Sequence, residues 1–99
     1  MGYYIQNIRL SPEEDELTVN EYIGSNTINS IAVTGAFDLP VSDELQDLAS
    51  RQENIIAIVD ANGVEHFLNS IKNNNPSGRD VQKLIELVEE KLQDGFMII

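Results

Sequence analysis

The sequence predicts an α+β fold: a largely antiparallel sheet of four to six strands, one long C-terminal helix at about 78–94 and one short helix at about 42–51. Three observations support this prediction. Apolar residues recur with a period of two in several short segments and with a helical period near the C-terminus. Hydrophobic residues make up 41% of the chain, which favours a packed core over a disordered acidic chain. With no repeat or linker, residues 1–99 are expected to form a single domain.

The N-terminal third is predicted to contain three strands. Residues 3–10 follow a period of two, and an acidic turn is expected at 11–16. Residues 17–23 are predicted as a strand, because their apolar side chains share one face of a strand and scatter around a helix. Gly24-Ser25-Asn26 predicts a turn, and the branched residues from Ile28 to Thr34 predict the third strand.

A short helix and a central strand are expected next. Pro40 and Ser42 mark the start of the helix at 42–51. Its inward positions are expected to be Leu45, Leu48 and Ala49. The nearly unbroken apolar run from Ile55 to Val59 predicts a central strand.

Residues 60–73 allow two predictions. Asp60-Ala61-Asn62-Gly63 is typical of a hairpin turn, which would lead into a strand at 64–68. The alternative is a helix at 64–73, because four apolar residues fit the i, i+3, i+4, i+7 spacing; they are Val64, Phe67, Leu68 and Ile71. The hairpin is preferred, because the Asn-Gly turn is specific and the helix would be short.

The C-terminal quarter gives the clearest helical pattern. A polar loop is expected at 73–78, with Ser77 as the N-cap of the long helix and Gly95 at its C′ position. Phe96–Ile99 is predicted to dock as a final strand, with an oligomer contact as the alternative role of this apolar tail. The apolar stripe of the helix consists of Val81, Leu84, Ile85, Val88 and Leu92.

The charge of the chain is strongly negative, with 17 acidic and six basic residues and a formal net charge of −11. Nine of the acids lie within residues 1–50, where Arg9 is the only basic residue. Such a field attracts basic partners and repels nucleic acids and anionic membranes. The sequence therefore predicts a basic protein partner and no direct binding to nucleic acid or membrane.

The sequence predicts no enzymatic activity. The chain has no cysteine, and His66, its single histidine, is expected to have a structural or surface role. No motif of a phosphate-binding loop, a nucleophile elbow or a zinc protease occurs, so no catalytic residue, metal or cofactor is predicted. No apolar run approaches the 18 residues of a membrane span, and the N-terminus lacks the basic region of a signal peptide. We therefore expect a cytoplasmic protein that is not an enzyme.

Two acidic clusters are the candidate partner-binding residues. Acids one helical turn apart lie about 5–6 Å from each other, and acids at alternate strand positions about 6.7 Å. Both spacings are on the scale of one or two phosphate steps of about 3.4 Å in a nucleic-acid strand. Tyr3 and Tyr4 place one ring on each face of a strand, so one of them is expected to be an exposed anchor. The clusters are Glu13, Glu14, Asp15, Glu16 and Glu21 in a turn and strand, and Asp43, Glu44 and Asp47 on the short helix.

These features favour a binding protein over an enzyme. The composition is typical of small inhibitors such as phage anti-defence proteins and nucleic-acid mimics. We expect the acidic N-terminal half to dock on a basic host or phage protein that handles nucleic acid, and to inhibit it. The alternative is a structural or assembly subunit, such as a virion component, in which strand edges and the Phe96–Ile99 tail make the contacts. There the chain would form a homo-oligomer or a larger complex, and its acidity would serve solubility.

Overall fold

The described part of the chain folds as a four-stranded antiparallel sheet with four α-helices. The structure is a computed structural model, and it describes residues 2–8, 19–38, 41–51, 54–74 and 78–99. The sheet order is β2-β1-β4-β3, and all three neighbouring pairs are antiparallel. In chain order the elements are β1 (Gly2–Asn7), β2 (Asn20–Gly24), α1 (Ser25–Ala32), α2 (Asp43–Arg51), β3 (Ala57–Asp60), a 3-10 turn η1 (Ala61–Gly63), α3 (Val64–Asn73), α4 (Arg79–Lys91) and β4 (Gly95–Ile98).

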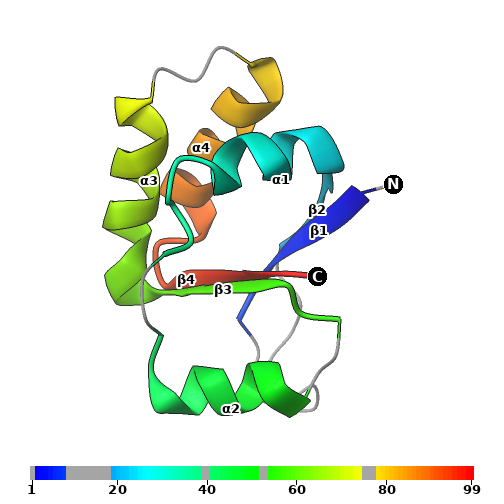
Figure 1. Cartoon of the computed structure of the whole chain (residues 1–99), viewed down its shortest axis with the longest axis vertical. Helices are drawn as coiled ribbons and strands as arrows, with labels where there is room; N and C mark the ends of the chain where they lie inside the picture. Colours follow the sequence, from blue (N-terminus) through cyan, green and yellow to red (C-terminus); the bar gives the residue numbers. More distant parts are fainter. Residues whose placement is uncertain (1, 9–18, 39–40, 52–53, 75–77) are drawn as a thin grey trace.

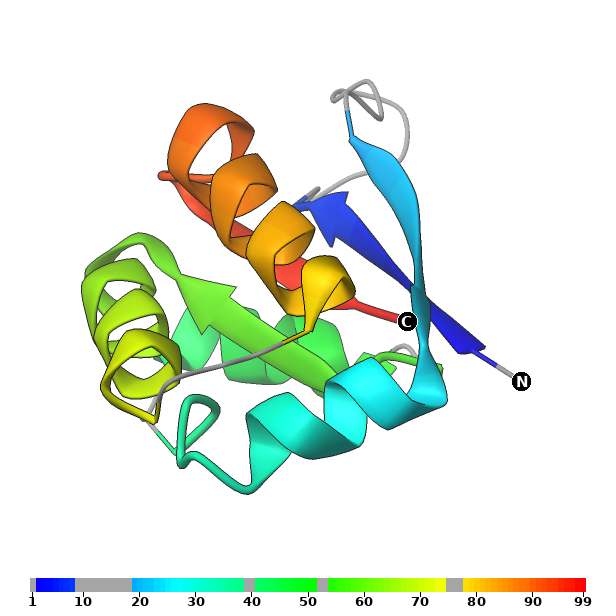
Figure 2. The same cartoon turned by 90° about the horizontal axis from the view of Figure 1, so that it is seen from above.

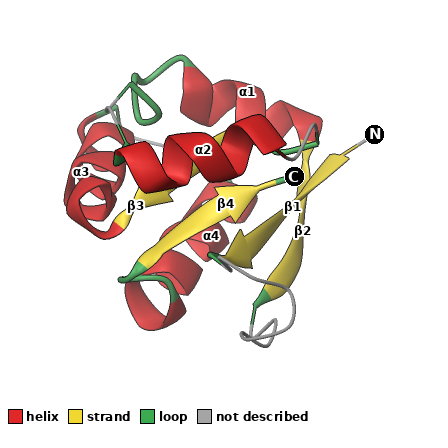
Figure 3. Ribbon diagram, turned by 90° about the horizontal axis from the view of Figure 1, so that it is seen from below, coloured by secondary structure: helices red, strands yellow, loops and turns green. Residues whose placement is uncertain are grey.

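The helices divide unequally between the two faces of the sheet. Helices α1, α3 and α4 lie over one face and α2 lies under the other (Figure 1). Figure 2 shows the first group from above, with α4 running over the sheet beside α1 and α3. Seen from below, α2 crosses in front of β3 and part of β4, whereas β1 and β2 lie to one side and are not covered by it (Figure 3). We call the side with three helices the covered face and the α2 side the open face.

The main core lies between the sheet and the three helices of the covered face. Alternate strand residues point into it, so that Ile5 of β1 and Phe96 and Ile98 of β4 are fully buried. The ring of Phe96 meets that of Phe67 of α3 edge to face, with centroids 4.9 Å apart. The predicted stripe of α4 is buried throughout, at Val81, Leu84, Ile85, Val88 and Leu92.

Five predicted elements are confirmed, and with them the α+β class. The strands expected at 3–10 and 17–23 are β1 and β2, and the helices expected at 42–51 and 78–94 are α2 and α4. The apolar tail 96–99 forms most of β4, which is buried between β1 and β3 and so takes the core role. Predictions that lie outside the described residues are the acidic turn at 11–16, the Ser77 cap and residues 75–77 of the loop at 73–78.

The strand predicted at 28–34 is wrong, as is the turn before it. Strand β2 runs directly into α1, which begins at Ser25. Ile28 and Ile31, three residues apart, are the buried residues of α1, as a helix face requires. Strand alternation would instead have buried Val33 together with Ile31, yet Val33 is 85% exposed.

The preferred hairpin at 60–68 is also wrong, and the alternative helix is correct. The side chain of Asp60 accepts a hydrogen bond of 3.0 Å from the amide of Gly63, so it caps a 3-10 turn instead of starting a hairpin. That turn continues into α3. The four apolar residues of the helical alternative, Val64, Phe67, Leu68 and Ile71, are all buried.

Two further details differ from the predictions. The strand expected at 55–59 is β3, which begins at Ala57 and lies at an edge of the sheet; the central positions belong to β1 and β4. Helix α4 ends at Lys91, so Gly95 is not its C′ residue. Gly95 instead starts β4 with φ +108°, and a Cβ there would lie 2.8 Å from the carbonyl oxygen of Val59. The glycine is needed for the close approach to β3.

Candidate protein-binding surface

Helix α2 presents a row of carboxylates on the open face of the molecule. Leu45 and Leu48 are its buried residues, and the acidic positions before and between them are exposed to solvent. The helix begins after Ser42, whose hydroxyl accepts a hydrogen bond of 3.4 Å from the amide of Leu45. The exposed acids are Asp43, Glu44 and Asp47, and this cluster is called the α2 acids below.

The α2 acids are only partly neutralised within the chain. Asp47 forms an ion pair of 3.2 Å with Arg51 one turn later, and both side chains are 66% exposed. An exposed pair of this kind contributes little to stability. Asp43 and Glu44 lie in the first turn, where the helix dipole favours negative charge by about 0.3–1 kcal/mol per residue.

The other predicted acidic cluster does not join the α2 acids in the part of the chain that the structure describes. Glu21 lies on β2 opposite Ile5, so it faces α4 on the covered face of the sheet. Glu13, Glu14, Asp15 and Glu16 lie outside the described residues. Glu21 and the α2 acids are therefore on opposite faces of the sheet, although the sequence places them in the same acidic half.

Two tyrosines are exposed on the open face, on the same side of the sheet as α2. Tyr4 pairs with Tyr22 across β1 and β2, and their rings meet edge to face with centroids 5.7 Å apart. Tyr4 is 45% exposed and Tyr22 61% exposed. Tyr3, one residue earlier, packs against the main core. The expectation that one of Tyr3 and Tyr4 is exposed is confirmed.

The tyrosine pair continues into the end of the chain. Tyr4 exchanges two backbone hydrogen bonds with Ile99, of 2.7 and 2.9 Å, so Ile99 lies beside it on the neighbouring strand. The ring of Tyr22 covers Gly2, where a Cβ would overlap the tyrosine ring. Tyr22, Tyr4 and Ile99 thus form one row across β2, β1 and the residue that follows β4. Figure 3 shows that α2 does not cover β1 and β2. Exposed aromatic groups in such a position are typical of protein-binding surfaces.

His66 is held in a structural contact. Its Nε2 lies 3.2 Å from the carbonyl oxygen of Gly35 and 3.3 Å from the hydroxyl of Ser70. A carbonyl oxygen only accepts, so Nε2 must carry the proton to bond to Gly35 and then cannot serve as a base for Ser70. The histidine ties α3 to the turn after α1.

The described residues contain no group of three or more histidine, cysteine, aspartate or glutamate side chains that could hold a metal ion. No helix in the described part of the chain has the length and apolar character required to cross a membrane.

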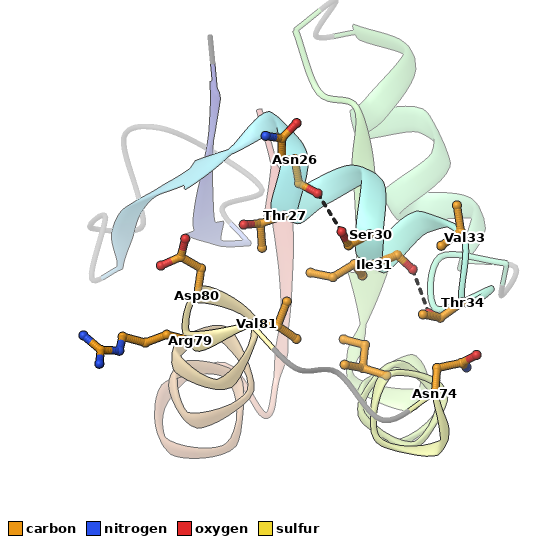
Figure 4. Close-up of a pocket in the computed structure, with 12 residues that line it drawn as sticks. Asn26, Thr27, Ser30, Ile31, Val33, Thr34, Asn74, Arg79, Asp80 and Val81 are labelled. Carbon is orange, nitrogen blue, oxygen red and sulfur yellow. Dashed lines mark hydrogen bonds between the residues drawn. The ribbon is translucent and has the colours of Figure 1, made fainter.

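Two pockets open beside α4. The first, of about 500 Å³, lies between α1, the end of α3 and the start of α4 (Figure 4). The hydroxyls of Ser30 and Thr34 donate to backbone carbonyls of α1 at 2.9 and 2.7 Å, and Arg79 points away from the pocket. These two hydroxyls are therefore engaged within α1. The second pocket, of about 570 Å³, lies between β2 and α4 and includes Glu21.

Comparison of the chain with protein-family models, curated proteins and solved structures finds no match. The functional proposal therefore rests on the surface that the α2 acids and the exposed tyrosines form. Tyr22, the partner of Tyr4, is not among the residues singled out from the sequence. The alternation in residues 20–24 could have indicated it, because Tyr22 and the buried Ile23 lie on opposite faces of the strand once the register of the hairpin is known.

Proposed function

We propose that this protein is a binding protein that docks its open face on a basic partner protein and inhibits it. The observation that carries the proposal is the α2 helix, whose buried leucines fix three carboxylates on its solvent side. The exposed tyrosines lie on the same side of the sheet and supply apolar contact area. Binding of this kind needs no catalytic residue and no cofactor.

The charge of the chain supports a cationic partner. A net charge of −11 on 99 residues steers positively charged surfaces toward the molecule, while carboxylates close to the contact fix the orientation. Arginine is the partner group that fits both features, because it pairs with carboxylates and stacks on tyrosine rings. We infer a partner that presents arginine or lysine side chains on its binding surface.

The class of partner that we favour is a nucleic-acid-handling protein of a host or phage, in the cytoplasm. Such proteins carry grooves lined by lysine and arginine that track a phosphate backbone. Carboxylates one helical turn apart, as Asp43 and Asp47 are, lie about 5–6 Å from each other and match the scale of the phosphate steps. Occupation of such a groove would exclude the nucleic acid and so inhibit the partner.

The first experiment is affinity capture from a bacterial lysate at low salt. Wild type is compared with the triple variant Asp43→Asn, Glu44→Gln and Asp47→Asn. We expect a basic protein to be retained by wild type and largely lost from the variant, because the variant removes the local charge and keeps the fold. Addition of wild type should also displace a bound oligonucleotide from that protein.

The matched control removes the same number of charges elsewhere. Glu65, Glu86 and Glu90 are exposed residues of α3 and α4, which lie on the covered face. Their change to glutamine should leave capture intact. Equal loss from both triple variants would show that only the overall charge matters and would contradict a site on α2. Loss only when Glu13, Glu14, Asp15 and Glu16 are neutralised would move the site to that segment.

A further inference from the structure

Among the described residues, strand β2 leaves one of its edges unpaired. Its only neighbour in the sheet of the described residues is β1. Tyr4 exchanges both of its backbone hydrogen bonds with Ile99 of the chain end, so its N–H and C=O point toward β4 and away from β2. Tyr4 and Tyr22 are therefore a non-hydrogen-bonded pair, and the N–H and C=O of Tyr22 point outward from the sheet. By the same alternation, the backbone groups of Asn20 also point outward.

A groove runs along this edge on the covered face. The pocket of about 570 Å³ between β2 and α4 has an apolar floor formed by Ile23, Leu84 and Leu87. Glu21 and Asp80 line it with two carboxylates, against one cation from Lys83. Successive side chains of a strand point to opposite faces. Alternate side chains of a strand added to β2 would therefore enter the groove, and the others would meet the exposed ring of Tyr22.

We propose that β2 binds an extended cationic segment of a protein by strand addition, with its basic side chains directed to Glu21 and Asp80 in the groove and its alternate side chains against the ring of Tyr22. Backbone hydrogen bonds to Asn20 and Tyr22 supply affinity, and the groove supplies preference for side chains. A second copy of this chain is disfavoured as the occupant, because antiparallel β2–β2 pairing would bring two Glu21 side chains together between molecules of charge −11. This surface is separate from the α2 acids, and it deepens the proposed function by assigning a second contact with a cationic partner.

The test uses a synthetic heptapeptide of alternating arginine and valine, blocked at both ends, followed by amide NMR of the whole chain. We expect shifts to concentrate at β2 and at the groove side of α4, and slower hydrogen exchange at the amides of Asn20 and Tyr22. A peptide with the same side chains but N-methylated at alternate residues should bind about tenfold more weakly, since it loses backbone hydrogen bonds to the edge of β2.

Two variants test the edge and the groove. Tyr22→Pro removes the outward N–H and the ring together, at a position where an edge strand tolerates proline, and should abolish the protection of the Asn20 amide. Glu21→Lys keeps the tyrosine and should lower the affinity for the arginine peptide about tenfold, the equivalent of about 1.4 kcal/mol. This second variant tests the groove even if the proline variant fails to fold.

The outcomes separate this inference from the proposed function. Shifts confined to α2, or equal binding of the N-methylated peptide, would overturn strand addition while leaving the α2 surface intact. Protection of Asn20 and Tyr22 that persists in the α2 triple variant would support the edge site, even if capture through α2 fails. No shift at either surface would overturn the inference.

Discussion

Replacement of Phe96 by alanine is expected to lower the free energy of unfolding by about 3–5 kcal/mol. The ring is fully buried on the central strand β4, and it contacts Phe67 of α3 edge to face. Its removal leaves a cavity at the point where the sheet and the helices of the covered face meet. Since domains of this size are stabilised by only about 5–15 kcal/mol, this is a large share of the total.

Urea denaturation followed by circular dichroism measures the effect. If Phe96→Ala is already unfolded in water, Phe96→Leu, which keeps part of the side chain, should still fold, with a midpoint below that of wild type. The control is Val33→Ala, at a position 85% exposed, which should stay within about 0.5 kcal/mol of wild type. Midpoints of Phe96→Leu and Val33→Ala that are both equal to wild type would contradict the placement of β4 in the centre of the sheet.

Leu84→Ala is expected to cost about 2–5 kcal/mol, and Val88→Ala somewhat less, because both remove buried methyl groups from the stripe of α4. Alanine has the higher helix propensity, so any loss must come from packing and not from the helix itself. Glu86→Ala is the matched control, on the exposed side of the same helix. Unchanged denaturation midpoints for both Leu84→Ala and Val88→Ala would show that the stripe is not buried.

The elements that sequence reasoning predicted correctly are those with long or unambiguous patterns. The predicted stripe has four buried positions within α4 and a fifth, Leu92, directly after its last residue, and no strand register buries all of them. Residues 28–34 are shorter, and their branched side chains suit a strand. There the packing of Ile28 and Ile31 on the sheet decides for a helix, and this packing depends on residues far away in the chain.

Asp60 illustrates a second limit. An aspartate before Asn-Gly can begin a hairpin or cap a helical turn, because the same side chain oxygen accepts an amide hydrogen bond in both cases. The buried residues after it decide the outcome. As a helix, this segment buries four apolar residues, which are Val64, Phe67, Leu68 and Ile71. A strand at 64–68 would have left part of this apolar set exposed. The sequence shows where the acidic residues lie along the chain but not where they lie in space. The sheet separates Glu21 from the α2 acids, and this separation follows only from the strand register.

A binding titration at two salt concentrations tests the central claim, that the α2 acids form the contact with a basic partner. The captured partner is titrated with wild type, the α2 triple variant and the triple variant of Glu65, Glu86 and Glu90, at about 50 and 300 mM salt, where screening lengths differ by more than twofold. We predict that only the α2 variant binds more weakly at low salt and that its affinity depends less on salt, because exposed charges at the contact steer association. Equal affinity of wild type and the α2 variant at about 50 mM salt would contradict the claim.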